Sequence, residues 1–131
     1  MSRNAPLLAV VDDDADVRVA LKRLAMSAGL DVEAFASGAE FLRSMQDHEP
    51  DCLVLDLHMP EMNGFDVQAA LATSSSTIPV VVITGRDTED ARARAMQLGA
   101  SAYLPKPVDH EALLAAIDVA VSERKPESGK T

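Results

Sequence analysis

Acidic residues follow two apolar runs of this sequence, where they could hold a divalent cation or take part in group transfer. The acidic run 12–14 follows the apolar run 7–11, and Asp56 follows the apolar run 52–55. Ligands of α/β proteins bind outside the carboxyl ends of strands. Carboxylates that meet there repel one another unless a cation lies between them. Taken alone, Asp56 is as easily a polar strand terminator, so its meaning depends on what the chain places beside it.

The elements that would position these acids are strands and helices in strict alternation. Apolar runs bounded by turn residues predict five strands, at residues 7–11, 30–36, 52–55, 78–83 and 102–104. Segments of helical periodicity lie between and after them, and they follow N-cap residues such as Asp14 or Asp16, Ser37, and Asp87 or Thr88. The fourth helix, which ends near Leu98, is rich in Ala and Arg, so we expect it to pack weakly.

Five strands alternating with five helices predict a (βα)5 flavodoxin-like, doubly wound α/β fold. Such a fold has a parallel sheet covered by helices on both faces. The common strand order is 2-1-3-4-5, which makes the first and third strands neighbours. Asp12 and Asp13 would then lie beside Asp56. Thr84 and Lys106, at the ends of the fourth and fifth strands, would lie at the same edge of the sheet, the rim formed by the carboxyl ends of its strands. The interpretation of Asp56 as merely a polar strand terminator is therefore less favoured.

Length and composition indicate one acidic domain. The 131 residues suit a single core, and we expect the domain to span residues 1–121, with 122–131 a polar tail or the start of a linker. The formal net charge of −9 argues against a nucleic-acid surface on this domain. Cys52 is the single cysteine, which indicates a reducing compartment. Without an apolar stretch typical of a signal peptide or a membrane span, we expect a cytoplasmic location and no membrane contact.

Several motifs occur together in a fixed order along the chain. They are Asp12-Asp13, Asp56 with Met59-Pro60 and Gly64 behind it, Thr84, Gly99-Ala100 before Tyr103, and Lys106-Pro107. Any one of them is weak, but the complete set resembles the receiver domain of response regulators in two-component signalling, from about Leu7 to Arg124. Residues 37–42 and 83–85 are most similar to FixJ-type receivers.

The resemblance implies that Asp56 is a phosphoacceptor. It would take a phosphoryl group from a phosphohistidine on a sensor histidine kinase or a phosphotransfer protein. A Mg²⁺ ion, or Mn²⁺ in its place, would be bound directly by Asp13, by Asp56 and by the backbone carbonyl of His58. Asp12 would bind the ion through water. The role of Mg²⁺ agrees with its preference for hard oxygen ligands and retained waters.

The resemblance assigns further roles around Asp56. Lys106 would contact the phosphoryl group, Thr84 would donate a hydrogen bond to it, and Tyr103 would turn inward as Thr84 moves. Arg86 and His58 occupy positions that tune dephosphorylation in this family. The peptide bond before Pro107 is expected to be cis. Without the resemblance, Tyr103 is more simply a core residue and Lys106 a solvated surface charge.

Other classes fit less well. An EF-hand loop beginning at Asp12 would have Val17 in place of its glycine, and a P-loop ending at 129–131 would have Arg124 in place of its first glycine. A receiver-shaped interaction module that works without phosphorylation stays open. So does the output, which is either a DNA-binding domain after residue 131 or a separate partner protein. In both cases the fourth helix, fifth strand and fifth helix are the expected contact surface, including a possible homodimer.

Overall fold

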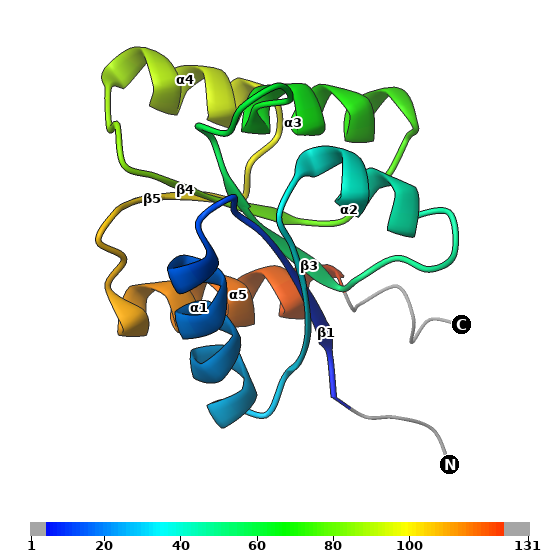
Figure 1. The fold of residues 1–131 in the computed structure, drawn as a ribbon, viewed down its shortest axis with the longest axis vertical. Coiled ribbons are helices and arrows are strands. Elements are labelled where there is room, and N and C mark those ends of the chain that lie inside the picture. The colour runs from blue at the N-terminus through cyan, green and yellow to red at the C-terminus, as the bar shows by residue number, and fades with distance from the viewer. Residues whose placement is uncertain (1–4, 125–131) are drawn as a thin grey trace.

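The computed structural model of the chain describes residues 5–124 and shows ten alternating elements. Figure 1 shows them as a central sheet between two layers of helices. In chain order they are β1 (Leu7–Val11), α1 (Ala15–Ser27), β2 (Asp31–Phe35), α2 (Gly38–Ser44), β3 (Cys52–Asp56), α3 (Gly64–Thr73), β4 (Val80–Thr84), α4 (Glu89–Gln97), β5 (Ala102–Pro105) and α5 (His110–Arg124).

The sheet has the topology predicted from the sequence. Its five strands are parallel and lie in the order β2-β1-β3-β4-β5. Helices α1 and α5 cover one face of the sheet, and α2, α3 and α4 cover the other (Figure 1). The (βα)5 flavodoxin-like, doubly wound fold is therefore confirmed.

Alternation along the strands divides the core between the two faces. In β3, Leu53 and Leu55 pack towards α2, α3 and α4, whereas Cys52 and Val54 pack towards α1 and α5. The other central strands alternate in the same way, and side chains along them are almost fully buried. Continuous apolar runs are expected for parallel strands that are buried on both faces. This alternation fixes which residue ends each strand and which way it points.

Two element boundaries differ from the predicted ones by more than one residue. Strand β4 begins at Val80 rather than Ile78, because Pro79 has no N–H for a sheet hydrogen bond and contributes only its carbonyl, to Leu53. Helix α5 continues to Arg124, so residues 122–124 are helical rather than part of a polar tail. The rest of the expected tail, residues 125–131, lies outside the described residues.

Two predicted features of the helices are also observed. Asp14 is the N-cap of α1, and its carboxylate accepts a hydrogen bond from the backbone N–H of Asp16. Helix α4 packs weakly, since Ala95 is its only fully buried residue.

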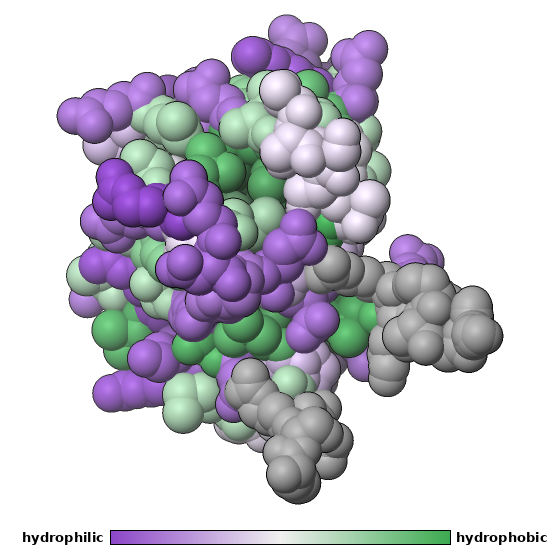
Figure 2. All heavy atoms as spheres, turned by 90° about the vertical axis from the view of Figure 1, so that its right-hand side faces the viewer, coloured by the Kyte–Doolittle hydropathy of each residue, from purple (hydrophilic) through white to green (hydrophobic). Residues whose placement is uncertain are grey.

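Within residues 5–124, no helix combines the length and hydropathy needed to cross a membrane. Figure 2 views the edge where the strands begin and shows hydrophobic groups interspersed among hydrophilic ones.

Gly64 sets the distance between α3 and the end of β3, which makes it a test of the packing. A Cβ atom at this position would lie 2.6 Å from the carbonyl oxygen of Asp56 and 2.8 Å from the Cα of Leu57. We predict that Gly64→Ala lowers the free energy of unfolding by about 2 kcal/mol, measured by urea denaturation. Gly85→Ala is the matched control, because a Cβ there meets no atom within 4 Å, and its effect should stay within about 1 kcal/mol. Equal effects of the two substitutions would contradict this account.

Candidate functional site

The strand register brings Asp12 and Asp56 together. Val11, the last residue of β1, pairs with Leu55 of β3, so the next residue of each strand meets at the same edge of the sheet. Asp56 in turn pairs with Ile83, which precedes Thr84 at the end of β4. The rim predicted from the sequence is therefore formed.

Three carboxylates form a cluster at this rim. One oxygen each from Asp12, Asp13 and Asp56 can be chosen so that all three lie within 4.8 Å of one another. Asp12 is fully buried and Asp56 is 3% exposed, whereas Asp13 is exposed to solvent. Two charges held away from water next to a third, solvated one make a site that attracts cations.

Lys106 supplies positive charge to the buried pair. Its Nζ lies 2.9 Å from Oδ2 of Asp12 and 3.4 Å from Oδ1 of Asp56. Burial lowers the pKa of the Lys106 ammonium, but the two carboxylates outweigh burial and the net shift of this pKa is upward. Lys106 is therefore a cation held in place within the site, not the solvated surface charge that it would be by default.

Asp56 carries the strongest perturbation among these groups. Burial, followed by repulsion from Asp12, raises the pKa of its carboxyl from 3.8 to about 6. Lys106 and the backbone N–H of His58 act in the opposite direction and only partly offset this rise. The negative charge of the Asp56 carboxylate is thus only partly neutralised by its neighbours. An additional cation would neutralise it further.

Asp12 is oriented by its neighbours on the chain and by α1. Its Oδ1 accepts a hydrogen bond from the backbone N–H of Asp14 at 2.9 Å. Its backbone carbonyl accepts a hydrogen bond from Nη1 of Arg18 at 2.8 Å. Arg18 could not be identified as a site residue from the sequence, because helical periodicity only places it on the polar side of α1. No local pattern identifies this contact, since it depends on how α1 leaves the sheet.

Thr84 and Lys106 are linked through the backbone. The N–H of Lys106 donates to the carbonyl oxygen of Thr84 at 2.7 Å. The hydroxyl of Thr84 is buried and accepts a hydrogen bond from the backbone N–H of Arg86 at 3.0 Å. The Lys106–Pro107 peptide bond is cis, the isomer expected from the resemblance. The ends of β4 and β5 thus form one connected part of the rim.

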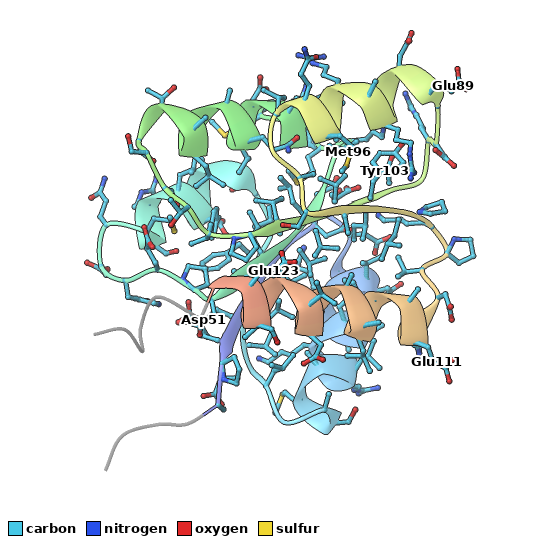
Figure 3. All side chains as sticks on the ribbon, turned by 180° about the vertical axis from the view of Figure 1, so that it is seen from behind. Asp51, Glu89, Met96, Tyr103, Glu111 and Glu123 are labelled. Carbon is cyan, nitrogen blue, oxygen red and sulfur yellow. The ribbon has the colours of Figure 1, made fainter. Side chains whose placement is uncertain are left out.

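Tyr103 already points inward in this structure. It is 5% exposed, and Figure 3 shows its side chain between the sheet and α4. Burial and the neighbouring Asp87 raise the pKa of its hydroxyl, although the hydroxyl makes no hydrogen bond of ordinary geometry. The guanidinium of Arg92 lies over the ring, 5.3 Å from its centroid. The contacts of Arg92 and Asp87 with Tyr103 were not predicted from the sequence, because only the position of α4 over β5 brings these residues to Tyr103.

The remaining predicted site residues, His58 and Arg86, are exposed loop residues on either side of the site. The backbone of each contacts a site side chain, the N–H of His58 reaching Asp56 and that of Arg86 reaching Thr84. Their proposed roles, through the His58 carbonyl and the Arg86 guanidinium, stay predictions.

The donor set fits a hard divalent cation such as Mg²⁺. It consists of carboxylate oxygens at the carboxyl ends of adjacent strands, one of them solvated, which suits an ion that keeps several of its waters. A carboxylate beside residues that could hold a cation, together with a fixed ammonium, suits phosphoryl transfer, because charge develops on the transferred oxygens.

Comparison with known proteins agrees with this geometry. The family model of the response regulator receiver domain matches residues 8–118. The response regulator protein TodT of Pseudomonas putida is 39% identical over 121 residues, which cover 92% of this chain and 53% of TodT. The solved structure of the response regulator StyR is 39% identical with a TM-score of 0.87, covering 95% of this chain and 63% of StyR. The structure of FixJ-N is 30% identical with a TM-score of 0.84, covering 92% and 96%.

The chain therefore belongs to the response regulator receiver domain family. It is a receiver domain similar to those of response regulators and to CheY-like and FixJ-like structures. It spans about half the length of the curated relatives it matches.

The raised pKa of Asp56 leads to a prediction about stability. The folded chain holds the Asp56 proton more tightly than the unfolded chain, so this group lowers stability as the pH rises from about 4 to about 6. Asp56→Asn removes this penalty. At pH 8 in EDTA it should raise the free energy of unfolding by about 2 kcal/mol, and the gain should shrink as the pH falls to 4. Asp118→Asn, which removes an exposed charge, should give neither the gain nor its pH dependence.

Proposed function

We propose that this domain is a phosphorylation-dependent signalling switch whose phosphoacceptor is Asp56. The observation that carries the proposal is the buried Asp56 carboxylate, whose charge is only partly neutralised although it lies 3.4 Å from the Lys106 ammonium, because it also lies beside Asp12. A merely structural acid would not need a costly environment of this kind. The donors would be a sensor histidine kinase or a phosphotransfer protein, as for other receivers.

In the proposed reaction an oxygen of Asp56 attacks the phosphorus of a phosphohistidine. The new O–P bond forms as the P–N bond breaks, and the imidazole nitrogen takes the electron pair. Asp13, Asp56 and the His58 carbonyl would hold a Mg²⁺ ion, with Asp12 acting through water, and the bound ion would neutralise charge on the transferred oxygens. Lys106 leaves its ion pair with Asp56 and binds a phosphoryl oxygen, because that group now carries the negative charge.

The proposed response runs from Thr84 to the surface of α4, β5 and α5. The Thr84 hydroxyl exchanges its bond with the Arg86 N–H for one to the phosphoryl group. Tyr103, already inward, is held there by this change. The altered α4-β5-α5 surface then contacts a partner, an output domain that follows the receiver, or a second copy of the chain. We also propose a cytoplasmic location, with the receiver extending through α5 to Arg124 and a linker after it.

Labelling with a small phosphodonor tests the phosphoacceptor. After incubation with acetyl phosphate and Mg²⁺, we expect intact-mass spectrometry to show a gain of one phosphoryl group that hydroxylamine removes. Asp56→Asn and EDTA should each abolish the gain, whereas Asp118→Asn should label as the wild type does. Failure of the wild type to label, with Mg²⁺ present, would favour an interaction module that works without phosphorylation.

The lifetime of the phosphorylated state tests Arg86. We propose that its exposed side chain shields the phosphoryl group from water. Arg86→Ala should therefore speed loss of the phosphoryl group by roughly three- to tenfold, about 1 kcal/mol in the barrier. The decay can be followed by mass spectrometry after removal of the donor. Arg23→Ala, on α1, serves as the control. An unchanged decay rate for Arg86→Ala would show that this side chain has no shielding role.

A further inference from the structure

Helix α4 is joined to the rest of the domain by few contacts, and these differ between its two ends. Ala95 is its only fully buried residue, while Ala91 and Leu98 beyond its end pack partly against the core. The other side chains of the helix are mostly charged or exposed. Position and motion of α4 therefore depend on a small number of identifiable interactions.

The C-terminal end of α4 is tied to α3 by a buried hydrogen bond. Gln68 of α3 is 2% exposed, and its Nε2 donates to the backbone carbonyl of Ala95 at 3.0 Å. The same carbonyl accepts the N–H of Ala100 at 3.0 Å, the bond that closes the end of the helix. In addition, the guanidinium of Arg94 stacks over the ring of Phe65 of α3 at 4.2 Å. Both contacts connect the same two helices.

The Gln68 amide is not simply filling space. Its Oε1 is buried and has no hydrogen-bond partner among residues 5–124, an arrangement that costs stability. An open surface pocket of about 340 Å³ also lies beside it, lined by Gln68, Leu98 and Ser101 among others. The hydrogen bond from Gln68 to Ala95 therefore acts together with the apolar contacts of Ala95 and Leu98 in holding this end of α4.

The N-terminal turn of α4 rests on the switch residue instead. Arg92 lies over the ring of Tyr103, and Tyr103 belongs to β5 next to the phosphoacceptor rim. Asp87, just before the N-cap residue Thr88, is the charged neighbour of the Tyr103 hydroxyl. The contacts of Tyr103 with Arg92 and Asp87 thus both lie at the N-terminal end of α4.

We propose that Gln68 is a positioning residue that anchors α4 at its C-terminal end, so that the helix moves as a lever about this anchor. A rearrangement at Thr84 and Tyr103 shifts the N-terminal turn through Arg92, while the end held by Gln68 stays in place. The direction of the signal rests on the proposed function; the anchor itself does not depend on it.

Hydrogen exchange of the unphosphorylated protein tests the anchor. Gln68→Met keeps the length and shape of the side chain, removes the bond to Ala95 and also removes the unpartnered oxygen. We expect the amides of Leu98 to Ala100 to exchange about tenfold faster, with no decrease in Tm. Gln97→Met, the same change on the exposed side of α4, should alter neither. Unchanged exchange in Gln68→Met, or faster exchange throughout the sheet, would overturn the anchor.

The two arginines of α4 test the division between its ends. Arg92→Ala should speed exchange only in the first turn, at Ala91 and Arg92, whose amides bond to Thr88. Arg94→Ala should act only near Leu98. If either substitution loosened both ends equally, α4 would behave as one unit and the lever would be excluded.

Activation by beryllofluoride, a phosphoryl analogue, with Mg²⁺ tests the motion. In the wild type we expect altered exchange at residues 89–92 and none at 98–100, and in Gln68→Met at both. Equal changes at both ends of the wild-type helix would overturn the lever. No change anywhere, including around Thr84, would count against the proposed function, and the measurements on the unphosphorylated protein would still decide whether Gln68 anchors the helix.

Discussion

The ion pairs from Lys106 to Asp12 and Asp56 are the interaction on which the rest of the site depends. Two carboxylates that are almost fully buried repel each other, and one ammonium at 2.9 and 3.4 Å compensates them only in part. The remaining imbalance appears as the raised pKa of Asp56. A fold selected for stability alone would replace this arrangement with apolar residues. The imbalance instead leaves the site ready to gain from a divalent cation and from a group that engages Lys106.

This charge arrangement requires the strands to end in register. Asp12, Asp56, Thr84 and Lys106 come from four adjacent strands, and the apolar alternation in each strand fixes which residue reaches the rim. A slip of one residue in β3 would place Leu53 and Leu55 on the face of Cys52 and Val54 and would turn Asp56 away. Gly64 adds a second constraint, because only a residue without a Cβ lets α3 approach the end of β3. The strand register and the close approach of α3 that pack the core therefore also fix the geometry of the site.

This dependence explains what could be predicted from sequence. Apolar runs and the rules of parallel topology were sufficient for the sheet order and for the meeting of Asp12, Asp56, Thr84 and Lys106 at one rim. The contacts of Arg18, Gln68 and Arg92 were not predictable, because each depends on how a helix is placed over the sheet rather than on a local pattern. Gln68 looks like an ordinary polar residue of an amphipathic helix, yet it is buried. The first residue of β4 was misplaced for a local reason, the missing N–H of Pro79.

Weak attachment of α4 is what the proposed switch requires. To reverse a 99:1 population, a modification must favour one state by about 5.5 kcal/mol. New hydrogen bonds from Thr84 and Lys106 to a phosphoryl group, each charge-assisted and worth about 1.5–3 kcal/mol, approach this value. They could not do so if α4 were held by a large apolar interface, since burying one large apolar side chain already contributes about 1.5–3 kcal/mol. With Ala95 as its only fully buried residue, α4 is attached loosely enough for the proposed phosphorylation of Asp56 to reposition it.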